Sequence, residues 1–165
     1  MENLRLSLIL LATIGSGVTG GIFFAFSTFV MQALAKLPSA QGIAAMQAIN
    51  ITVINPWFMV AFFAPAVAGV VLSISLLFQW QQSIAAYLLA ASLLYLIGTI
   101  GTTVMGNIPL NDALAVVTPA SVEGSTLWAK YLTNWTFWNH LRTAAALSAA
   151  TLFAIAFHLR TGLTT

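Results

Sequence analysis

Residues 57–78 read WFMVAFFAPAVAGVVLSISLLF, a stretch that contains no charged residue and only two serines as polar side chains. A helix needs about 20 predominantly apolar residues to cross the hydrocarbon core of a bilayer. This stretch is long enough to do so, and three other stretches of the chain are as well. The spans are expected at about residues 4–35, 57–78, 84–105 and 137–157.

The composition is that of an integral membrane protein. Of its 165 residues, 60% are hydrophobic and 5% are charged, and the mean hydropathy is +0.97. Soluble domains carry roughly 25% charged residues, so this chain has too few charges to cover a surface that faces water. The sequence predicts an all-α integral membrane protein, a four-helix bundle that forms one domain over residues 1–165.

Several kinds of site are excluded by composition. The chain has no cysteine, which rules out disulfides, thiolate metal sites and a cysteine nucleophile. The two histidines, His140 and His158, lie about 27 Å apart if they share one helix, so they cannot bind one metal ion. We therefore predict no metal site. The net charge of +2 rests on so few groups that it gives no reason to expect a nucleic-acid partner.

The connections between the spans define two ends of the bundle. Four spans place both termini at one end, together with a tight turn expected at residues 79–83. The other end, called here the loop end, holds the two longer connections, residues 36–56 and 106–136. A short helix is expected from Ala40 to Ile49 in the first of these, and the second also has room for one. Lysine and arginine are spread over both ends, so they do not orient the protein. We expect a multi-pass protein of the cell membrane, with cytoplasmic termini as the preferred orientation.

The unusual polar residues gather at the loop end of the spans. At about 100° per residue, one stripe of the fourth span carries Trp135, Trp138, Asn139 and Arg142, whereas His140 points away from it. The full set near this end also includes Ser27, Thr28, Asn50, Asn55, Thr102, Asn107 and Asn111. A chemical site, if the protein has one, is therefore expected at the loop end.

Each of these residues also has an ordinary interpretation. An arginine close to a helix end can extend to the lipid headgroups, although an inward arginine with polar partners is favoured here because Arg142 shares its stripe with Asn139. Trp135 and Trp138 fit an interfacial aromatic belt as well as a ligand pocket. His140 fits an interfacial position better than the role of a catalytic base.

Small residues recur in the first span at four-residue steps, at Thr13, Gly17, Gly21 and Ala25. Such spacing lets two helix backbones approach closely in lipid, so this stripe is expected to contact another helix. Gly98, Gly101 and Gly106 are expected to do the same in the third span. Pro65 should kink the second span and free a carbonyl one turn earlier.

Three segments together resemble a known family. They are FFAFSTFVMQAL (23–34), GNIPLNDAL (106–114) and WTFWNHLRT (135–143), and their arrangement resembles the anthrone-oxygenase-like family of small four-span membrane proteins. The resemblance covers essentially the whole chain and implies a four-helix membrane bundle. It also implies that molecular oxygen oxidises an anthrone to an anthraquinone without metal or organic cofactor. The positions that match the family pattern are Asn107, Pro109, Asn111, Trp135, Asn139 and Arg142.

Two functions follow as hypotheses. The first is a membrane oxidoreductase that takes an apolar polycyclic or quinone-like substrate from the lipid. In it Arg142, Asn139 and His140 are the candidate catalytic residues, and Trp135, Trp138, Asn107 and Asn111 are the candidate substrate-binding residues. The second is a non-enzymatic ligand-binding or accessory bundle, in which the polar cluster only ties helix ends together. The lipid bilayer and an apolar small molecule are the expected partners. The sequence is also compatible with a homo-oligomer. Open space beside Arg142 would favour the enzyme.

Overall fold

The protein is an all-α bundle, as expected. The computed structural model describes residues 2–76 and 84–162, so the turn expected at residues 79–83 lies outside the described residues. The first span is continuous through α1 (Glu2–Ala25), the wide π turn η1 (Phe26–Val30) and α2 (Met31–Ala35). A separate helix, α3 (Ser39–Thr52), follows it and confirms the short helix expected in this connection. The second span is α4 (Pro56–Leu76).

The third and fourth spans are longer than expected. The third runs through α5 (Ala85–Leu93), η2 (Leu94–Gly101), η3 (Thr103–Asn107) and α6 (Ile108–Ala115), and the fourth is α7 (Val122–Gly162). The connection between them was expected over residues 106–136, but it shortens to residues 116–121. Polar composition there marks a helical region outside the lipid rather than a loop.

Within residues 2–76 and 84–162, four helices are long and apolar enough to cross a membrane, which makes the protein a multi-pass membrane protein. The 21 residues of α4 extend about 30 Å, the thickness of the hydrocarbon core, whereas the 41 residues of α7 extend about 60 Å. The exposed face of α7 changes along its length, from Lys130 and Asn134 to Phe137 and Leu141. The loop end of the bundle therefore projects beyond the lipid.

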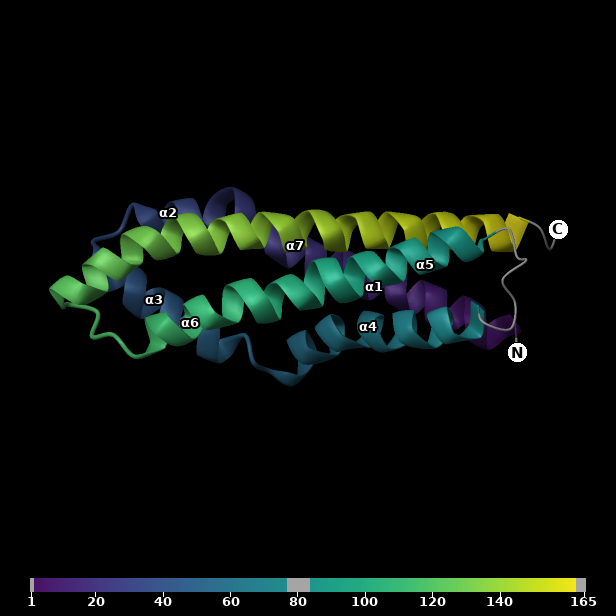
Figure 1. The fold of residues 1–165 in the computed structure, drawn as a ribbon, viewed down its shortest axis with the longest axis horizontal. Coiled ribbons are helices and arrows are strands. Elements are labelled where there is room, and N and C mark those ends of the chain that lie inside the picture. The colour runs from purple at the N-terminus through teal and green to yellow at the C-terminus, as the bar shows by residue number, and fades with distance from the viewer. Residues whose placement is uncertain (1, 77–83, 163–165) are drawn as a thin grey trace.

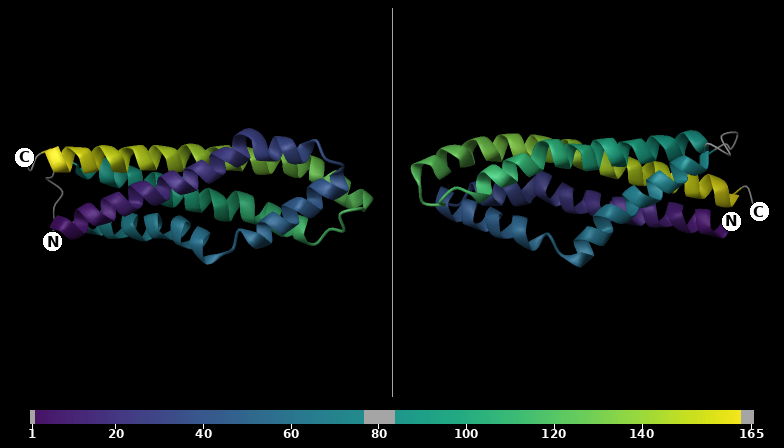
Figure 2. Two further views of the ribbon diagram at one scale, coloured as in Figure 1. Left: turned by 180° about the vertical axis from the view of Figure 1, so that it is seen from behind. Right: turned by 60° about the horizontal axis from the view of Figure 1, so that its bottom comes forward.

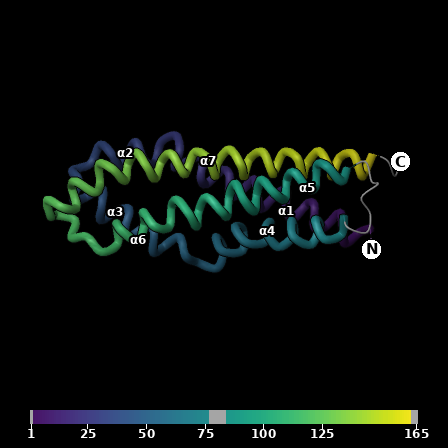
Figure 3. Tube along the Cα trace, in the orientation of Figure 1, coloured from purple at the N-terminus to yellow at the C-terminus, as the bar shows by residue number. Residues whose placement is uncertain are grey.

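Three long helical columns run the length of the molecule, and α3 and α4 share the fourth (Figure 1). Both termini lie at the same end of the bundle, as the four spans require. The two views in Figure 2 show α3 and α4 following one another along one side, with a bend between them. The Cα trace shows the same arrangement without the ribbon width (Figure 3). This break, at residues 53–55, is the one place where a column changes helix within its length among the described residues.

The buried side chains form two clusters. The first, called the terminal core, lies between α1, α4, α5, η2 and α7 and consists of Leu, Ile, Ala, one Tyr and one Phe. The second, called the loop-end core, lies between α2, α3, α6 and the first part of α7. Its members are larger and less regular: Met31, Leu34, Ile43, Met46, Leu114, Trp128, Tyr131 and Trp135. The site described below lies where the two cores meet.

The small-residue stripe predicted for the first span was wrong. A Cβ built on Gly17 or Gly21 would have no neighbouring atom within 4 Å, and Gly21 is exposed. The contact face lies one to two positions away. There a Cβ on Gly15 would overlap Cγ of Pro65, and one on Gly20 would lie 2.7 Å from Cδ2 of Leu147. Lipid tails and helix neighbours are both apolar, so spacing alone did not reveal which face meets protein.

In the third span, two of the three glycines named from the sequence make close contacts. A Cβ on Gly98 would lie 2.6 Å from the Cβ of Ala145, and one on Gly106 would overlap the indole of Trp138. Gly101 has only a carbonyl of its own span nearby, at 3.7 Å.

Pro65 frees a carbonyl one turn earlier in α4, as predicted. Pro65 has no N–H with which to bond the Ala61 carbonyl. The Thr19 hydroxyl of α1 donates to this carbonyl at 3.1 Å. The freed carbonyl therefore links the first two spans.

Candidate functional site

Arg142 faces the interior of the bundle. Its side chain is 7% exposed, and its Nε donates to Oδ1 of Asn139 at 2.9 Å. Its Nη1 reaches Oγ1 of Thr103 at the longer distance of 3.5 Å. Because Arg142 lies five residues inside the apolar face of α7 that begins at Phe137, it is a buried cation at membrane depth. The inward orientation expected from its stripe is confirmed.

Asn139 holds the arginine in this orientation. While its Oδ1 accepts from Arg142, its Nδ2 donates to the Phe23 carbonyl and to Oγ of Ser27, both at 2.7 Å. Phe23 lies in the last turn of α1, and Ser27 lies in the wide turn η1 that follows at Phe26. Asn139 therefore links α7 to the first span at the point where its helix widens. Thr143 donates to the Asn139 carbonyl at 2.6 Å and lies 3.1 Å from Ser27.

Two aromatic rings enclose the guanidinium. The Cζ of Arg142 lies 3.9 Å from the ring centroid of Phe23 and 4.9 Å from that of Trp135. A guanidinium over an aromatic face is attracted by the electrons of the ring. These contacts stabilise the cation without neutralising its charge.

Within residues 2–76 and 84–162, no carboxylate pairs with this cation. An ion pair joins Arg160 to Glu2 at 3.0 Å, but it lies at the terminal end. The other two acidic residues of the chain, Asp112 and Glu123, are exposed. Buried charges are ordinarily paired, so a guanidinium without a carboxylate is the most unusual feature of this bundle.

Asn111 fixes the indole that flanks Arg142. Its Oδ1 accepts from the Tyr131 hydroxyl at 2.7 Å and from Nε1 of Trp135 at 2.8 Å. The rings of Trp128, Tyr131 and Trp135 stack along α7 with centroids 5.5 and 6.0 Å apart. Both of these hydrogen bonds use the amide oxygen of Asn111. Its amide nitrogen is therefore available to donate to another acceptor.

Asn107 has a different position. It is fully buried, and its Nδ2 donates to the Trp135 carbonyl at 3.1 Å. Its Oδ1 has no hydrogen-bond partner within the described part of the chain. The sequence suggested that Arg142 would meet the asparagines at 107, 111 and 139. The structure gives it a hydrogen bond to Asn139, while the other two hold Trp135 in place.

A cavity of about 270 Å³ opens beside Arg142, at the break between α3 and α4. Its walls are mainly apolar and aromatic, and its polar groups are Asn50, Thr103, Asn111 and Arg142. Such a lining, with a few convergent polar groups, is typical of small-molecule sites. The remaining lining residues are Ile22, Phe23, Phe26, Met46, Ile49, Val53, Ile54, Phe58, Met59, Phe62, Phe63, Ile108 and Trp135.

The cavity opens towards the region that lipid would occupy. On its rim, Ile54 is 71% exposed and Phe63 is 50% exposed. Trp57, at the start of α4, is 87% exposed, as an indole at a membrane interface would be. The opening therefore lies near the level at which the exposed face of α7 changes from polar to apolar.

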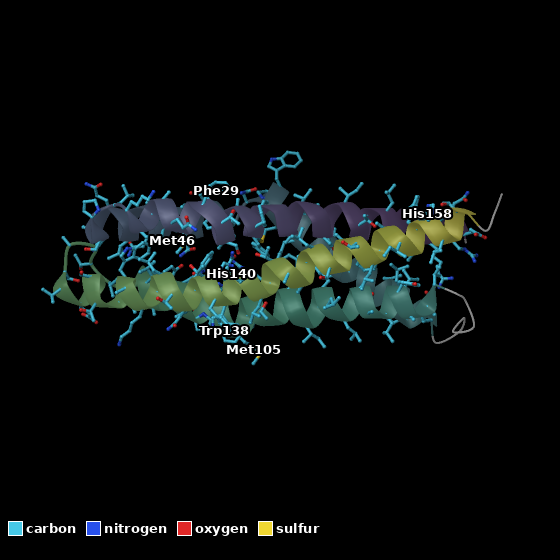
Figure 4. The ribbon with its side chains drawn as sticks, turned by 90° about the horizontal axis from the view of Figure 1, so that it is seen from above. Phe29, Met46, Met105, Trp138, His140 and His158 are labelled. Atoms are coloured by element: carbon cyan, nitrogen blue, oxygen red, sulfur yellow. The ribbon has the colours of Figure 1, made fainter. Side chains whose placement is uncertain are left out.

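Four of the seven site residues named from the sequence do not line this cavity: Asn107, Trp138, Asn139 and His140. The two asparagines are bonded within the bundle as described above. The ring of Trp138 packs against Gly106 of η3, and His140 is exposed. Figure 4 shows Trp138 beside Met105, away from Met46 on the cavity side, and it shows His140 and His158 far apart along α7. Among the described residues, no three His, Asp or Glu side chains come close enough together to hold a metal ion.

Sequence reasoning missed the phenylalanines of the first two spans. Phe23 covers Arg142, and the stacked rings of Phe58 and Phe62, 5.7 Å apart, form another wall. The signal was present in the clustering of phenylalanine at the loop ends of both spans. It could not be separated there from phenylalanine that faces lipid.

Comparison with known proteins gives one match. The sequence model of the family described as anthrone oxygenase matches residues 57–152, which include α4, the third span and Arg142. No curated protein and no solved structure matches the chain.

Proposed function

Because the chain belongs to the anthrone oxygenase family, we propose that it is a cofactor-independent membrane oxygenase. It acts on a flat, apolar polycyclic substrate of the anthrone or quinone-like class, and it does so in the cavity between α3 and α4. The cell membrane is the proposed location, and the lipid is the proposed source of the substrate.

The observation that carries this proposal is open space next to a buried cation that has no carboxylate partner. In an accessory bundle whose polar cluster only ties helices together, the groups around Arg142 would satisfy one another and fill the space. Here only Nε and Nη1 of the guanidinium donate hydrogen bonds to described residues, and Arg142 lines a cavity of about 270 Å³. The open cavity argues against an accessory bundle whose polar cluster only ties helices together. A non-enzymatic ligand-binding bundle is the alternative that the turnover experiment below separates from an oxygenase.

The reaction proposed is the conversion of a methylene to a carbonyl. One CH2 group and one O2 molecule give one C=O group and one water molecule, so no other reductant is required. Loss of a proton from the methylene gives an enolate, which supplies the electrons that reduce oxygen. The hydroperoxide that forms at that carbon then loses water.

The residues around the cavity suit the enolate. Phe23 and Trp135 line the cavity, and their rings offer apolar contact to a flat substrate beside the guanidinium that lies over them. Arg142 is placed to stabilise the enolate oxygen in a setting from which water is excluded, where such an interaction is strongest. Asn139 is a positioning residue in this proposal, because its hydrogen bonds are used in orienting Arg142 and contacting α1. Asn111 adds an amide donor at the other edge of the indole.

The test is turnover of anthrone by the full chain in lipid vesicles, measured as oxygen uptake and as the absorbance of the anthraquinone formed. Arg142→Lys should lower kcat about 10²–10³-fold, the loss typical of one oxyanion donor, since an ammonium lacks the planar fork. Arg160→Lys, at the terminal end, is the matched control and should resemble the parent. Parent protein without activity above empty vesicles, or equal kcat in both variants, would contradict the proposal.

A further inference from the structure

Among the described residues, the cavity is lined by a permanent cation and by no base. Of its lining residues, Arg142 alone carries a titratable side chain, and a guanidinium cannot accept a proton. The other titratable groups on the surrounding helices do not line the cavity. On α7, the Tyr131 hydroxyl is bonded to Asn111 and His140 is exposed.

The other surrounding helices add no base to the lining either. On α6, Asp112 is exposed. In η2, the Tyr95 hydroxyl donates to the Phe62 carbonyl at 2.8 Å. The parts of α1, η1, α3 and α4 that line the cavity carry no Asp, Glu, His, Lys or Tyr. A ligand that binds here therefore finds a partner for negative charge and no group that could take its proton.

We infer that the cavity takes its ligand as an anion, a phenolate or an enolate, whose proton is released to water rather than to a side chain. The inference deepens the proposed function by naming the substrate class: flat aromatic acids that ionise near neutral pH when a cation stabilises them. It rests on the proposed site but not on the oxidation step.

Two opposing effects decide the ionisation of such a ligand. Transfer into an apolar cavity raises the pKa of a phenol or enol, because burial disfavours the charged form. A guanidinium within contact distance lowers the pKa, by about 1–3 units for a close opposite charge. Arg142 has no carboxylate among the described residues to neutralise it, and the hydrogen bonds described above engage two of its N–H groups, one of them at 3.5 Å. The attraction should therefore exceed the effect of burial.

This balance also accounts for a guanidinium without a carboxylate. A neutral ketone or ether would leave the charge of Arg142 without a counterion in the bound complex. An anionic ligand supplies the missing partner, and a flat one keeps its negative oxygen in the plane of the donors while its rings meet Phe23 and Trp135.

A binding experiment can measure the sign of the shift. The probe is 2-hydroxyanthraquinone, a flat tricyclic phenol whose visible absorption changes on ionisation. It is titrated in the presence of the detergent-solubilised full chain and in protein-free micelles. We expect the bound probe to have a pKa about 1–3 units below its value in micelles. An unchanged or raised pKa would overturn the inference, and so would failure of the probe to bind at any pH.

Variants and a second probe sharpen the result. Arg142→Gln should move the pKa of the bound probe above its micelle value, because only the effect of burial is left. Lys130→Gln, which removes an exposed cation from the same helix, should leave the pKa at the parental value. The neutral 2-methoxyanthraquinone should bind the parent more weakly than the phenolate does; equal or tighter binding would count against an anion site. The parent alone decides the sign, so the experiment does not depend on the folding of a variant.

The probe has no methylene to oxidise, which separates this inference from the oxygenase proposal. A lowered pKa of the probe with no turnover of anthrone would support the anion site and contradict the oxygenase proposal. Turnover of anthrone with a raised pKa of the probe would support the oxygenase proposal and contradict the anion site.

Discussion

The two halves of this bundle use the same helical columns in different ways. In the terminal half, α1 approaches α4 and α7 through Gly15 and Gly20, with Pro65 and Leu147 directly against them. In the loop-end half, larger side chains fill the space between the columns, among them the stacked rings of α7, and one column changes from α3 to α4. Arg142 and the cavity both lie in this second half.

The difference indicates how a small membrane bundle makes room for a ligand. Close approach of backbones gives many van der Waals contacts, which drive helix association in lipid. A broken column forgoes those contacts locally, and the wide turns η1 and η3 lie beside it, where Phe26 of η1 and Thr103 of η3 line the cavity. Wide turns of this type occur frequently at functional sites. The terminal half therefore supplies stability for a loop-end half that holds the site.

The largest effect on stability is expected from adding bulk to the terminal half. Gly15→Ala places a Cβ inside van der Waals contact with Cγ of Pro65, and the rigid proline ring cannot move aside as a flexible chain would. Overpacking of this kind costs about 1–3 kcal/mol. Thermal unfolding in detergent should show a lower midpoint for this variant than for the parent.

The matched control for that variant is Gly21→Ala. Gly21 lies on the same helix, and a Cβ at this position would have nothing within 4 Å, so its replacement should be neutral or slightly stabilising. Equal decreases of the unfolding midpoint in the two variants would contradict the contact face assigned to α1. They would also contradict the contrast between the two halves.

A smaller effect on stability is expected from adding bulk to the cavity. Val53→Phe extends a side chain that lines the open space, so it should change the free energy of unfolding by less than about 1 kcal/mol. The same variant should weaken binding of 2-hydroxyanthraquinone about tenfold or more, a factor that corresponds to about 1.4 kcal/mol. Both quantities can be measured on one preparation.

The control for the cavity variant is Val67→Phe, on the exposed face of α4. It should alter neither stability nor binding. If Val53→Phe destabilises the bundle as strongly as Gly15→Ala does, the loop-end half is as densely packed as the terminal half and the comparison fails.

The sequence was sufficient for the spans because lipid imposes a simple requirement of length and apolar character. It also placed Arg142 on the inner face, because a polar residue on an apolar helix has few favourable directions. The sequence could not identify the contact face of α1, where Gly17 and Gly21 have the same spacing as a packing stripe. Lipid and core are equally apolar, so hydrophobic periodicity does not distinguish them.

The cavity itself lay further beyond sequence reasoning. The break at residues 53–55 lies in a connection that the sequence marked as polar, yet nothing in the sequence placed it beside Arg142, with which Val53 and Ile54 line one cavity. The fourth span was expected to begin near Phe137, but the helix begins at Val122. The helical part before Phe137 carries Tyr131 and Trp135, which both donate hydrogen bonds to Asn111. Trp135 and Asn111 form one wall of the cavity.

The most direct test of the central claim is the position of a bound ligand. The full chain can be crystallised from lipid with a brominated 2-hydroxyanthraquinone, and the anomalous signal of bromine then locates the ring system. The account predicts one bromine peak in the cavity between α3 and α4, with the ligand's phenolate oxygen within hydrogen-bond distance of the Arg142 guanidinium. A cavity filled by its own side chains, or a bromine peak outside it with Arg142 bonded only within the protein, would contradict the account.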